Sequence, residues 1–172
     1  GHGGSDTGAL STTDKYEKTY TLKTAEAIRS ALAAAGANVV MTRSTDSFVS
    51  LAKRPKIAHQ VKADAFISIH FDSTPDTNEA SGHTVYYYSS KKDISLARNL
   101  NVALKGVGTP SRGIEFGDFE VLRDNKQPSV LLEMGYINDD TDFSKIQTTA
   151  YQQKVANDVV NGLRSYFESG SR

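Results

Sequence analysis

The most informative stretch of this sequence is Ala65-Phe66-Ile67-Ser68-Ile69-His70. Its almost unbroken apolar run is typical of a strand that is buried on both faces, as in a parallel sheet. A second stretch of the same kind is Val130-Leu131-Leu132-Glu133. If the two strands lie side by side and parallel, their final residues, His70 and Glu133, project into the same crevice at the edge of the sheet.

Strand-like and helix-like segments alternate on both sides of these two stretches, which indicates an α/β fold. The apolar periodicity predicts helices over residues 14–35, 54–61, 93–105 and 150–167. It predicts further strands over residues 38–42, 84–88 and 119–122. Asp14 and Glu17 have the spacing of a capping box, and Gly36 is a natural end for the first helix.

Length and composition narrow the class of protein. The 172 residues predict one domain over residues 1–168 and a tail over residues 169–172. Lys and Arg number 20, as do Asp and Glu, and there is no basic run, so we expect no nucleic-acid partner. No apolar run is long enough to predict a membrane segment. The absence of cysteine excludes thiolate ligands, so any metal must be bound by His, Asp or Glu.

Four residues could carry chemistry. His2 lies in a glycine-rich loop, Glu17 in the first turn of a helix, and His70 and Glu133 at strand ends. Two histidines and one carboxylate form a standard catalytic zinc set, beside which a second glutamate can transfer protons.

The residues alone leave simpler explanations open. Glu17 could be the second half of a capping box. His70 could be a hydrogen-bonded histidine at a strand end, and His2 could belong to a disordered terminus. Glu133 is harder to explain in this way, because buried carboxylates are rare unless they are paired or liganded.

Several other stretches are distinctive when they are taken in order. They are residues 1–9, residues 16–18 with Leu22, residues 43–46 with Arg54, residues 63–70, residues 112–113 with Phe119, residues 121–123 and residues 130–138. Together they cover nearly the whole chain and resemble the motifs of the Amidase_3 family of N-acetylmuramoyl-L-alanine amidases.

This resemblance implies one Zn²⁺ per chain, bound by His2, Glu17 and His70, with Glu133 as the catalytic residue. It also implies a mixed, mostly parallel six-stranded sheet with helices on both faces. The first strand of that sheet would precede the glycine-rich motif and is missing from this chain. The implied reaction is hydrolysis of the amide between N-acetylmuramic acid and L-alanine in peptidoglycan, by a monomer located outside the cell or in its envelope. Wall-binding domains would lie outside this chain.

Two arginines are candidates for binding the carboxylates of peptidoglycan stem peptides, Arg112 and Arg123, because arginine binds a carboxylate through two parallel hydrogen bonds. The alternative is that they form surface ion pairs. Some relatives carry an inserted helix that blocks the zinc, but residues 89–112 have room for one ordinary helix, so we predict no such block here. The competing functions are a zinc peptidase that cuts within the stem peptide and a silent wall-binding relative.

Overall fold

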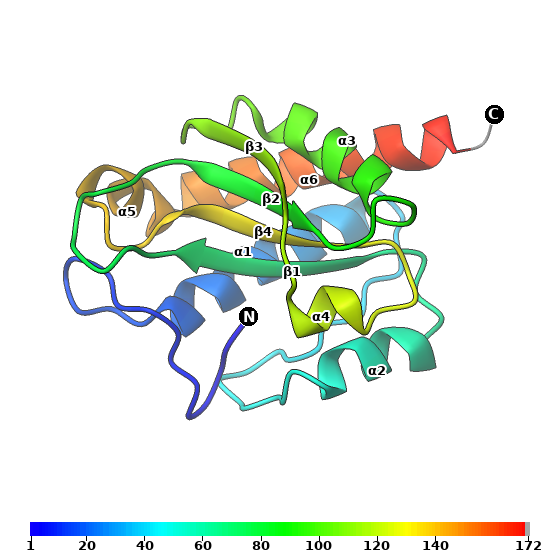
Figure 1. Ribbon diagram of the computed structural model, residues 1–172, viewed down its shortest axis with the longest axis horizontal. Helices are drawn as coiled ribbons and strands as arrows, with labels where there is room; N and C mark the ends of the chain where they lie inside the picture. Colours follow the sequence, from blue (N-terminus) through cyan, green and yellow to red (C-terminus); the bar gives the residue numbers. More distant parts are fainter. Residues whose placement is uncertain (171–172) are drawn as a thin grey trace.

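The sheet of the protein is mixed, as the sequence predicts. A computed structural model describes residues 1–170, which contain the strands β1 (Phe66–Asp72), β2 (His83–Tyr87), β3 (Ser111–Phe116) and β4 (Ser129–Tyr136). Their order is β1-β4-β2-β3 (Figure 1). β1 and β4 pair in parallel, as do β2 and β3, whereas β2 and β4 are antiparallel. The parallel pairing expected for the two apolar stretches, now β1 and β4, is therefore confirmed.

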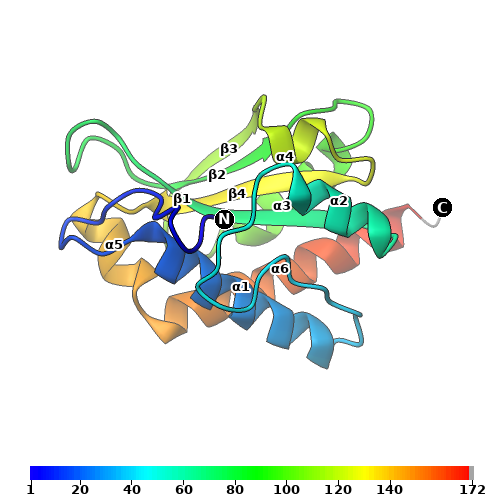
Figure 2. The same cartoon turned by 90° about the horizontal axis from the view of Figure 1, so that it is seen from below.

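Helices cover both faces of this sheet. On one face lie α1 (Glu17–Ala34), α3 (Ile94–Leu104) and α6 (Thr149–Ser169), which share the larger apolar core with the sheet. On the other face lie the shorter helices α2 (Lys53–Gln60) and α4 (Glu120–Arg123), over a smaller apolar cluster (Figure 2). A further helix, α5 (Asp140–Ile146), follows β4 closely.

The alternation of side chains along β4 divides its residues between the two faces. Val130, Leu132 and Met134 belong to the larger core and are fully buried. Burying an aliphatic side chain of this size contributes about 1.5–3 kcal/mol. Leu131 belongs to the smaller cluster, so Glu133, two residues further on, lies on that same face. The face with less helical cover is therefore the one that carries the polar strand ends.

The expected six-stranded sheet is wrong for this chain, since four strands are found in residues 1–170. Residues 38–42 form no strand. They line a cavity of about 690 Å³ whose other walls include β1 residues, so no ladder joins the two segments. Residues 119–122 are also not a strand, because Glu120–Arg123 forms the helix α4. A short apolar run such as Val121-Leu122 fits either structure, and its periodicity alone does not distinguish them.

The sequence analysis also missed a strand. β3 is an edge strand whose residues are exposed or half-buried, so it lacks the continuous apolar run that marks β1 and β4. At the start of the predicted tail, α6 extends to Ser169 and Gly170 is its C-cap. The rest of that tail, residues 171–172, lies outside the described residues. Among the helices of residues 1–170, none combines the length and apolar character that a membrane crossing requires.

Candidate metal centre

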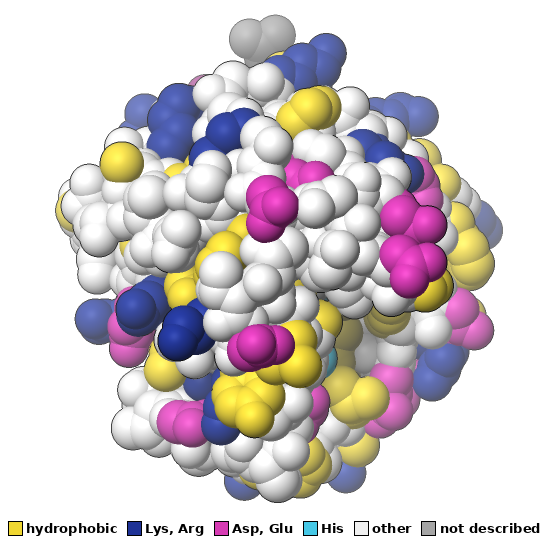
Figure 3. All heavy atoms as spheres, turned by 90° about the vertical axis from the view of Figure 1, so that its left-hand side faces the viewer, with side chains coloured by type: hydrophobic (Ala, Val, Ile, Leu, Met, Phe, Trp, Pro, Cys, Tyr) yellow, Lys and Arg dark blue, Asp and Glu magenta, His cyan; other side chains and the backbone are white. Residues whose placement is uncertain are grey.

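The four residues singled out in the sequence line one cavity of about 420 Å³. His70 lies two residues before the end of β1, and Glu133 is its register partner on the neighbouring strand β4. Glu17 is the first residue of α1, and His2 lies on the loop before it. On the molecular surface a histidine is visible in a hollow bordered by hydrophobic side chains (Figure 3). The site thus combines the C-terminal parts of two strands with a helix start and a loop.

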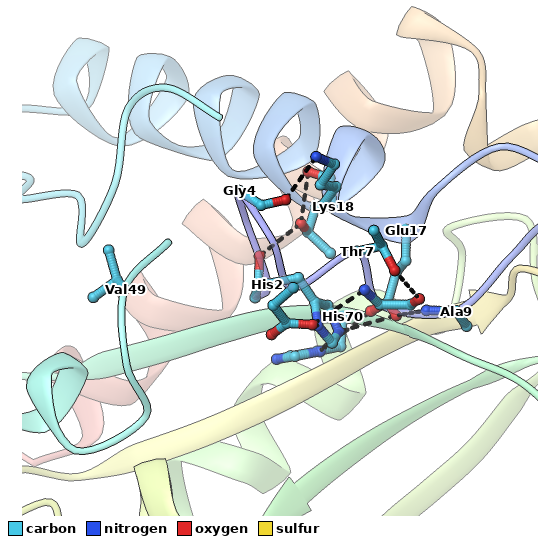
Figure 4. Close-up of polar contacts among 12 residues, drawn as sticks. His2, Gly4, Thr7, Ala9, Glu17, Lys18, Val49 and His70 are labelled. Carbon is cyan, nitrogen blue, oxygen red and sulfur yellow. Dashed lines mark hydrogen bonds and ion pairs between the residues drawn. The ribbon is translucent and has the colours of Figure 1, made fainter. Parts of the chain in front are cut away.

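Three of these side chains converge on a common point (Figure 4). His2 Nε2 lies 3.0 Å from Glu17 Oε2. His70 Nδ1 lies 3.1 Å from His2 Nε2 and 3.2 Å from Glu17 Oε1. The two histidines contact different oxygens of the Glu17 carboxylate, and one ligand atom from each of the three residues lies within 4.8 Å of the others.

These spacings fit a divalent ion. Zn²⁺ in tetrahedral coordination takes imidazole nitrogens and carboxylate oxygens at about 2.0–2.2 Å, so its ligand atoms lie roughly 3.3 Å apart. The observed separations of 3.0–3.2 Å are close to that value. Three protein ligands also leave the fourth position of a catalytic site open.

Further contacts orient these three side chains. Asp6 Oδ1 accepts a hydrogen bond from His2 Nδ1 at 2.8 Å, which leaves His2 Nε2 facing the other two ligands. A carboxylate in this outer position is typical of metal-bound histidines. Glu17 accepts backbone hydrogen bonds from Ala9 and Phe71, both at 3.0 Å. The capping-box explanation of Glu17 is therefore wrong, since its carboxylate contacts the loop and β1.

Steric crowding explains why position 8 of the glycine-rich loop is a glycine. A Cβ there would lie 2.5 Å from Glu17 Oε2 and 2.8 Å from His2 Cδ2, so a side chain at this position would displace two of the three ligands. Gly8 also has φ 65°, which is favourable only for glycine. His2 itself has φ 54°, and such a backbone costs a non-glycine residue about 1–2 kcal/mol. Strain of this kind is common at functional sites.

Glu133 has the character of a proton carrier. Its Oε2 atom is buried and has no hydrogen-bond partner among residues 1–170. Burial, followed by the charges of Glu17 and Asp72, raises the pKa of Glu133 well above its ordinary value. A carboxyl with a raised pKa can hold or release a proton near neutral pH.

The three ligand residues are electrostatically coupled. Burial lowers the pKa of His70 to about 4, although its contact with Glu17 opposes the shift. Burial acts in the same direction on His2, but hydrogen bonds to Glu17 and Asp6 outweigh it and raise the His2 pKa. Burial would raise the pKa of Glu17, yet its bonds to the two histidines hold that pKa far below its usual range. Glu17 is therefore an anion over the whole physiological range.

The other titratable candidates lie elsewhere. Arg112 does not line the cavity, but its guanidinium stacks over the Tyr136 ring at 5.4 Å. Burial, followed by the charge of Asp72 in the cavity lining, raises the pKa of Tyr136. Arg123 forms exposed ion pairs with two aspartates, at 2.6 Å and 3.3 Å.

The two remaining histidines have other contacts. His59 accepts a hydrogen bond from the Lys126 amide at 3.1 Å, and His83 is fully buried beside Thr109.

Three further residues support the site. They lie in stretches that resemble the family, but the sequence alone assigned them no individual role. Asp6 orients His2, while Arg43 and Arg54 bind the backbone around it. Apart from that resemblance, the sequence gives only a weak signal for their roles, because a short-range Asp and isolated arginines are common on any surface. Residues 89–111 contribute no lining residue to the cavity, and α3 packs against the opposite face of the sheet. Within the described residues 1–170, the segment between β2 and β3 therefore does not cover the site.

Comparisons with known proteins agree with this geometry. Residues 1–165 match the Amidase_3 family, described as N-acetylmuramoyl-L-alanine amidase. The "Probable cell wall amidase LytH" of Staphylococcus epidermidis is 46% identical over 98% of the chain and 57% of that relative. Its namesake in Staphylococcus aureus is 43% identical over the same shares. The chain thus spans little more than half the length of these curated relatives.

Two solved structures are similar throughout. The catalytic domain of CwlV, an N-acetylmuramoyl-L-alanine amidase from Bacillus (Paenibacillus) polymyxa var. colistinus, has a TM-score of 0.93 and 33% identity, covering 98% of this chain and 94% of that one. The N-acetylmuramoyl-L-alanine amidase AmiC2 of Nostoc punctiforme has a TM-score of 0.92 and 33% identity, covering 98% and 93%. The chain belongs to the Amidase_3 family.

Proposed function

We propose that residues 1–168 are the catalytic domain of a zinc-dependent N-acetylmuramoyl-L-alanine amidase that acts on bacterial peptidoglycan. The observation that carries this proposal is the convergence of His2, Glu17 and His70 within 3.0–3.2 Å, beside the buried Glu133. The family and the names of the relatives support the same substrate.

The roles of the four residues follow from their chemistry. His2 Nε2, Glu17 and His70 Nδ1 would hold one Zn²⁺ per chain. A bound Zn²⁺ supplies Lewis-acid polarisation of an amide carbonyl and a lower pKa for water. Glu133 would accept a proton from the attacking water and deliver it to the leaving nitrogen of L-alanine. Its lack of another hydrogen-bond partner among residues 1–170 leaves its Oε2 free for that transfer.

Arg112 and Arg123 are the proposed contacts to stem-peptide carboxylates. Arg112 forms no ion pair within residues 1–170, and its long 3.5 Å bond to the Ser81 carbonyl leaves most of its donors free. Arg123 would have to exchange its bonds to Asp118 and Asp124 for a substrate carboxylate. The geometry therefore favours Arg112 over Arg123.

The proposed location is the cell envelope or the outside of the cell, because peptidoglycan lies there and because the relatives are named cell wall amidases. We further propose that the chain acts as a monomer. Wall-binding segments of the whole protein would lie in the part of the relatives that this chain does not span.

Product analysis tests the proposed reaction. The metal-loaded protein would be incubated with purified peptidoglycan, and the soluble products examined by mass spectrometry and by labelling of new amino termini. We expect free stem peptides that begin with L-alanine and glycan strands that stay intact. New termini inside the stem peptide would instead indicate a peptidase, and an absence of products would indicate a silent relative.

Two variants assign the roles. Glu17→Gln should lose metal and turnover together, because it removes the anionic ligand. Glu133→Gln should bind one equivalent of Zn²⁺ and yet lose turnover by about 10²–10⁴-fold, the usual contribution of a general acid–base. Wild-type turnover in Glu133→Gln would disprove the role of Glu133, and turnover that survives complete metal removal would disprove the zinc dependence.

A further inference from the structure

Two buried arginines beside the candidate metal centre bind backbone carbonyl groups rather than carboxylates. The exposed fractions of Arg43 and Arg54 are 7% and 3%. Within residues 1–170 neither forms an ion pair with a carboxylate, and their hydrogen bonds go mainly to backbone carbonyl oxygens. Burying a charge without a charged partner is costly, so fold stability alone is a poor explanation for this pair.

Arg54 joins the loop of His2 to the neighbouring loop. Its Nη2 atom donates to the His2 carbonyl at 3.0 Å and to the Val49 carbonyl at 2.9 Å. Its Nε atom also donates to Val49, at 3.1 Å, so the guanidinium plane is fixed by two bonds to one acceptor (Figure 4 labels both His2 and Val49). The bond to His2 is made at the residue whose φ of 54° is unfavourable for a side chain.

Arg43 binds the backbone of Gly1, next to His2, and the helix that carries Glu17. Its Nη2 atom donates to the Gly1 carbonyl at 2.9 Å and to the Lys18 carbonyl at 2.8 Å. Its Nη1 atom donates to the Thr45 carbonyl at 3.0 Å. Arg43 thus ties the residue before His2 to the residue after Glu17.

We propose that Arg43 and Arg54 are positioning residues that hold the His2 backbone and the start of α1 in the arrangement needed for metal binding. Two consecutive carbonyls, those of Gly1 and His2, are each held by a different guanidinium. This inference rests on the proposed function, because it assigns the purpose of the arrangement to the ligand set of His2, Glu17 and His70.

Arginine is better suited than lysine to hold two backbone carbonyl groups at once. Its planar group presents several donors in a fixed fork, whereas lysine concentrates three donors on one rotatable nitrogen. A lysine at position 54 keeps the charge but cannot reproduce the three bonds to two carbonyls with the same geometry. The substitution Arg54→Lys therefore separates positioning from charge.

The experiment measures metal affinity directly. Wild type, Arg54→Lys, Arg54→Ala and Arg43→Lys would be purified without metal and titrated with Zn²⁺ in competition with a chromophoric chelator. Visible spectra with Co²⁺ in place of Zn²⁺ would report the ligand geometry, and circular dichroism would report the folded fraction. Arg98→Lys is the matched control, because Arg98 is exposed on α3, away from the site.

We expect the folded Arg54→Lys and Arg43→Lys proteins to bind Zn²⁺ at least tenfold more weakly than wild type and to give altered Co²⁺ spectra, and we expect Arg54→Ala to lose more. Arg98→Lys should match wild type in both measurements. Wild-type affinity and spectra in the folded arginine variants would overturn the inference and leave the proposed function intact. Failure of all three variants to fold would assign the arginines to the fold itself and also overturn it. If wild type binds no Zn²⁺, the proposed function fails with it.

Discussion

At Glu133, the need for a free carboxylate that can transfer protons conflicts with the stability of the fold. A carboxylate without a hydrogen-bond partner is useful for moving protons, yet burying it costs free energy of folding whenever it is ionised. Because the pKa of Glu133 is raised in the folded protein, the folded state binds a proton that the unfolded state releases above about pH 4.5. Its contribution to stability is therefore fully present below that pH and is lost as the pH rises.

The substitution Glu133→Gln should consequently stabilise the metal-free protein at pH 7, because glutamine cannot ionise and so avoids the cost of burying a charge. The gain should be small at pH 4, where Glu133 is protonated in both states. Urea denaturation at the two pH values, in the presence of a chelator, measures both differences. An equal gain at both values would show that burial of the charge is not the cause.

A second prediction concerns Arg112 and the carboxylate of the substrate. If its guanidinium binds a stem-peptide carboxylate, Arg112→Ala should raise KM for stems with a free carboxylate by about tenfold, the equivalent of one hydrogen bond to a charged group. It should leave amidated stems unaffected, because they lack the charge. Parallel kinetics on the two substrates test this. Equal losses on both would point to a structural role for the stacking on Tyr136.

The candidate residues could be named from the sequence, but their grouping could not be derived from spacing. His70 and Glu133 follow from the rule that parallel strands end at one edge, and that rule holds here. Glu17 is different, since its position three residues after Asp14 fits a capping box equally well. Only the packing of α1 against the loop and β1 shows that its carboxylate bonds Ala9 and Phe71 instead.

Among the elements, the long helices, the short helix α2 and the strand β2 were predictable, whereas α4, β3 and the structure of residues 38–42 were not. α1, α3 and α6 lie where the apolar periodicity places helices, within a few residues at each end. α4 has four residues, too few for a period to be recognised. β3 is an exposed edge strand, and residues 38–42 lack a paired neighbour among residues 1–170. In each of these cases tertiary surroundings, rather than local preference, determine the structure.

The contact between α3 and α6 depends on a glycine. A Cβ at Gly162 would lie 2.8 Å from Leu100 Cδ2 and 3.0 Å from Leu100 Cα, so an added methyl group meets backbone as well as side chain. Gly162→Ala gains about 1 kcal/mol of helix propensity, but overpacking costs about 1–3 kcal/mol. We expect a net loss of about 1 kcal/mol in the free energy of unfolding.

Urea denaturation checks this value. Asn161→Ala is the matched control, because Asn161 is the exposed neighbour of Gly162 on the same helix. It should be neutral or slightly stabilising. A gain in stability for Gly162→Ala would mean that the two helices separate without cost.

For the molecule as a whole, metal binding should act as a cross-link between its loop, helix and strand. A ligand that binds only the folded state adds about 4 kcal/mol at a thousandfold excess over its dissociation constant. For a chain of this size that corresponds to a rise of roughly 10 °C in Tm. Calorimetry with Zn²⁺ and with a chelator should show that difference in wild type and none in Glu17→Gln. A chelator-independent Tm in wild type would contradict it.

The strand order β1-β4-β2-β3 has a consequence for synthesis. The strand that joins the two halves of the sheet is the last to leave the ribosome, so β1 and β2 must wait for Ser129–Tyr136 before either gains its central neighbour. A nascent or truncated chain that ends before β4 would carry all three candidate metal ligands, yet it would lack the partner strand that holds His70 in register. Cleavage before residue 129 should therefore leave an unassembled polypeptide rather than a smaller working unit.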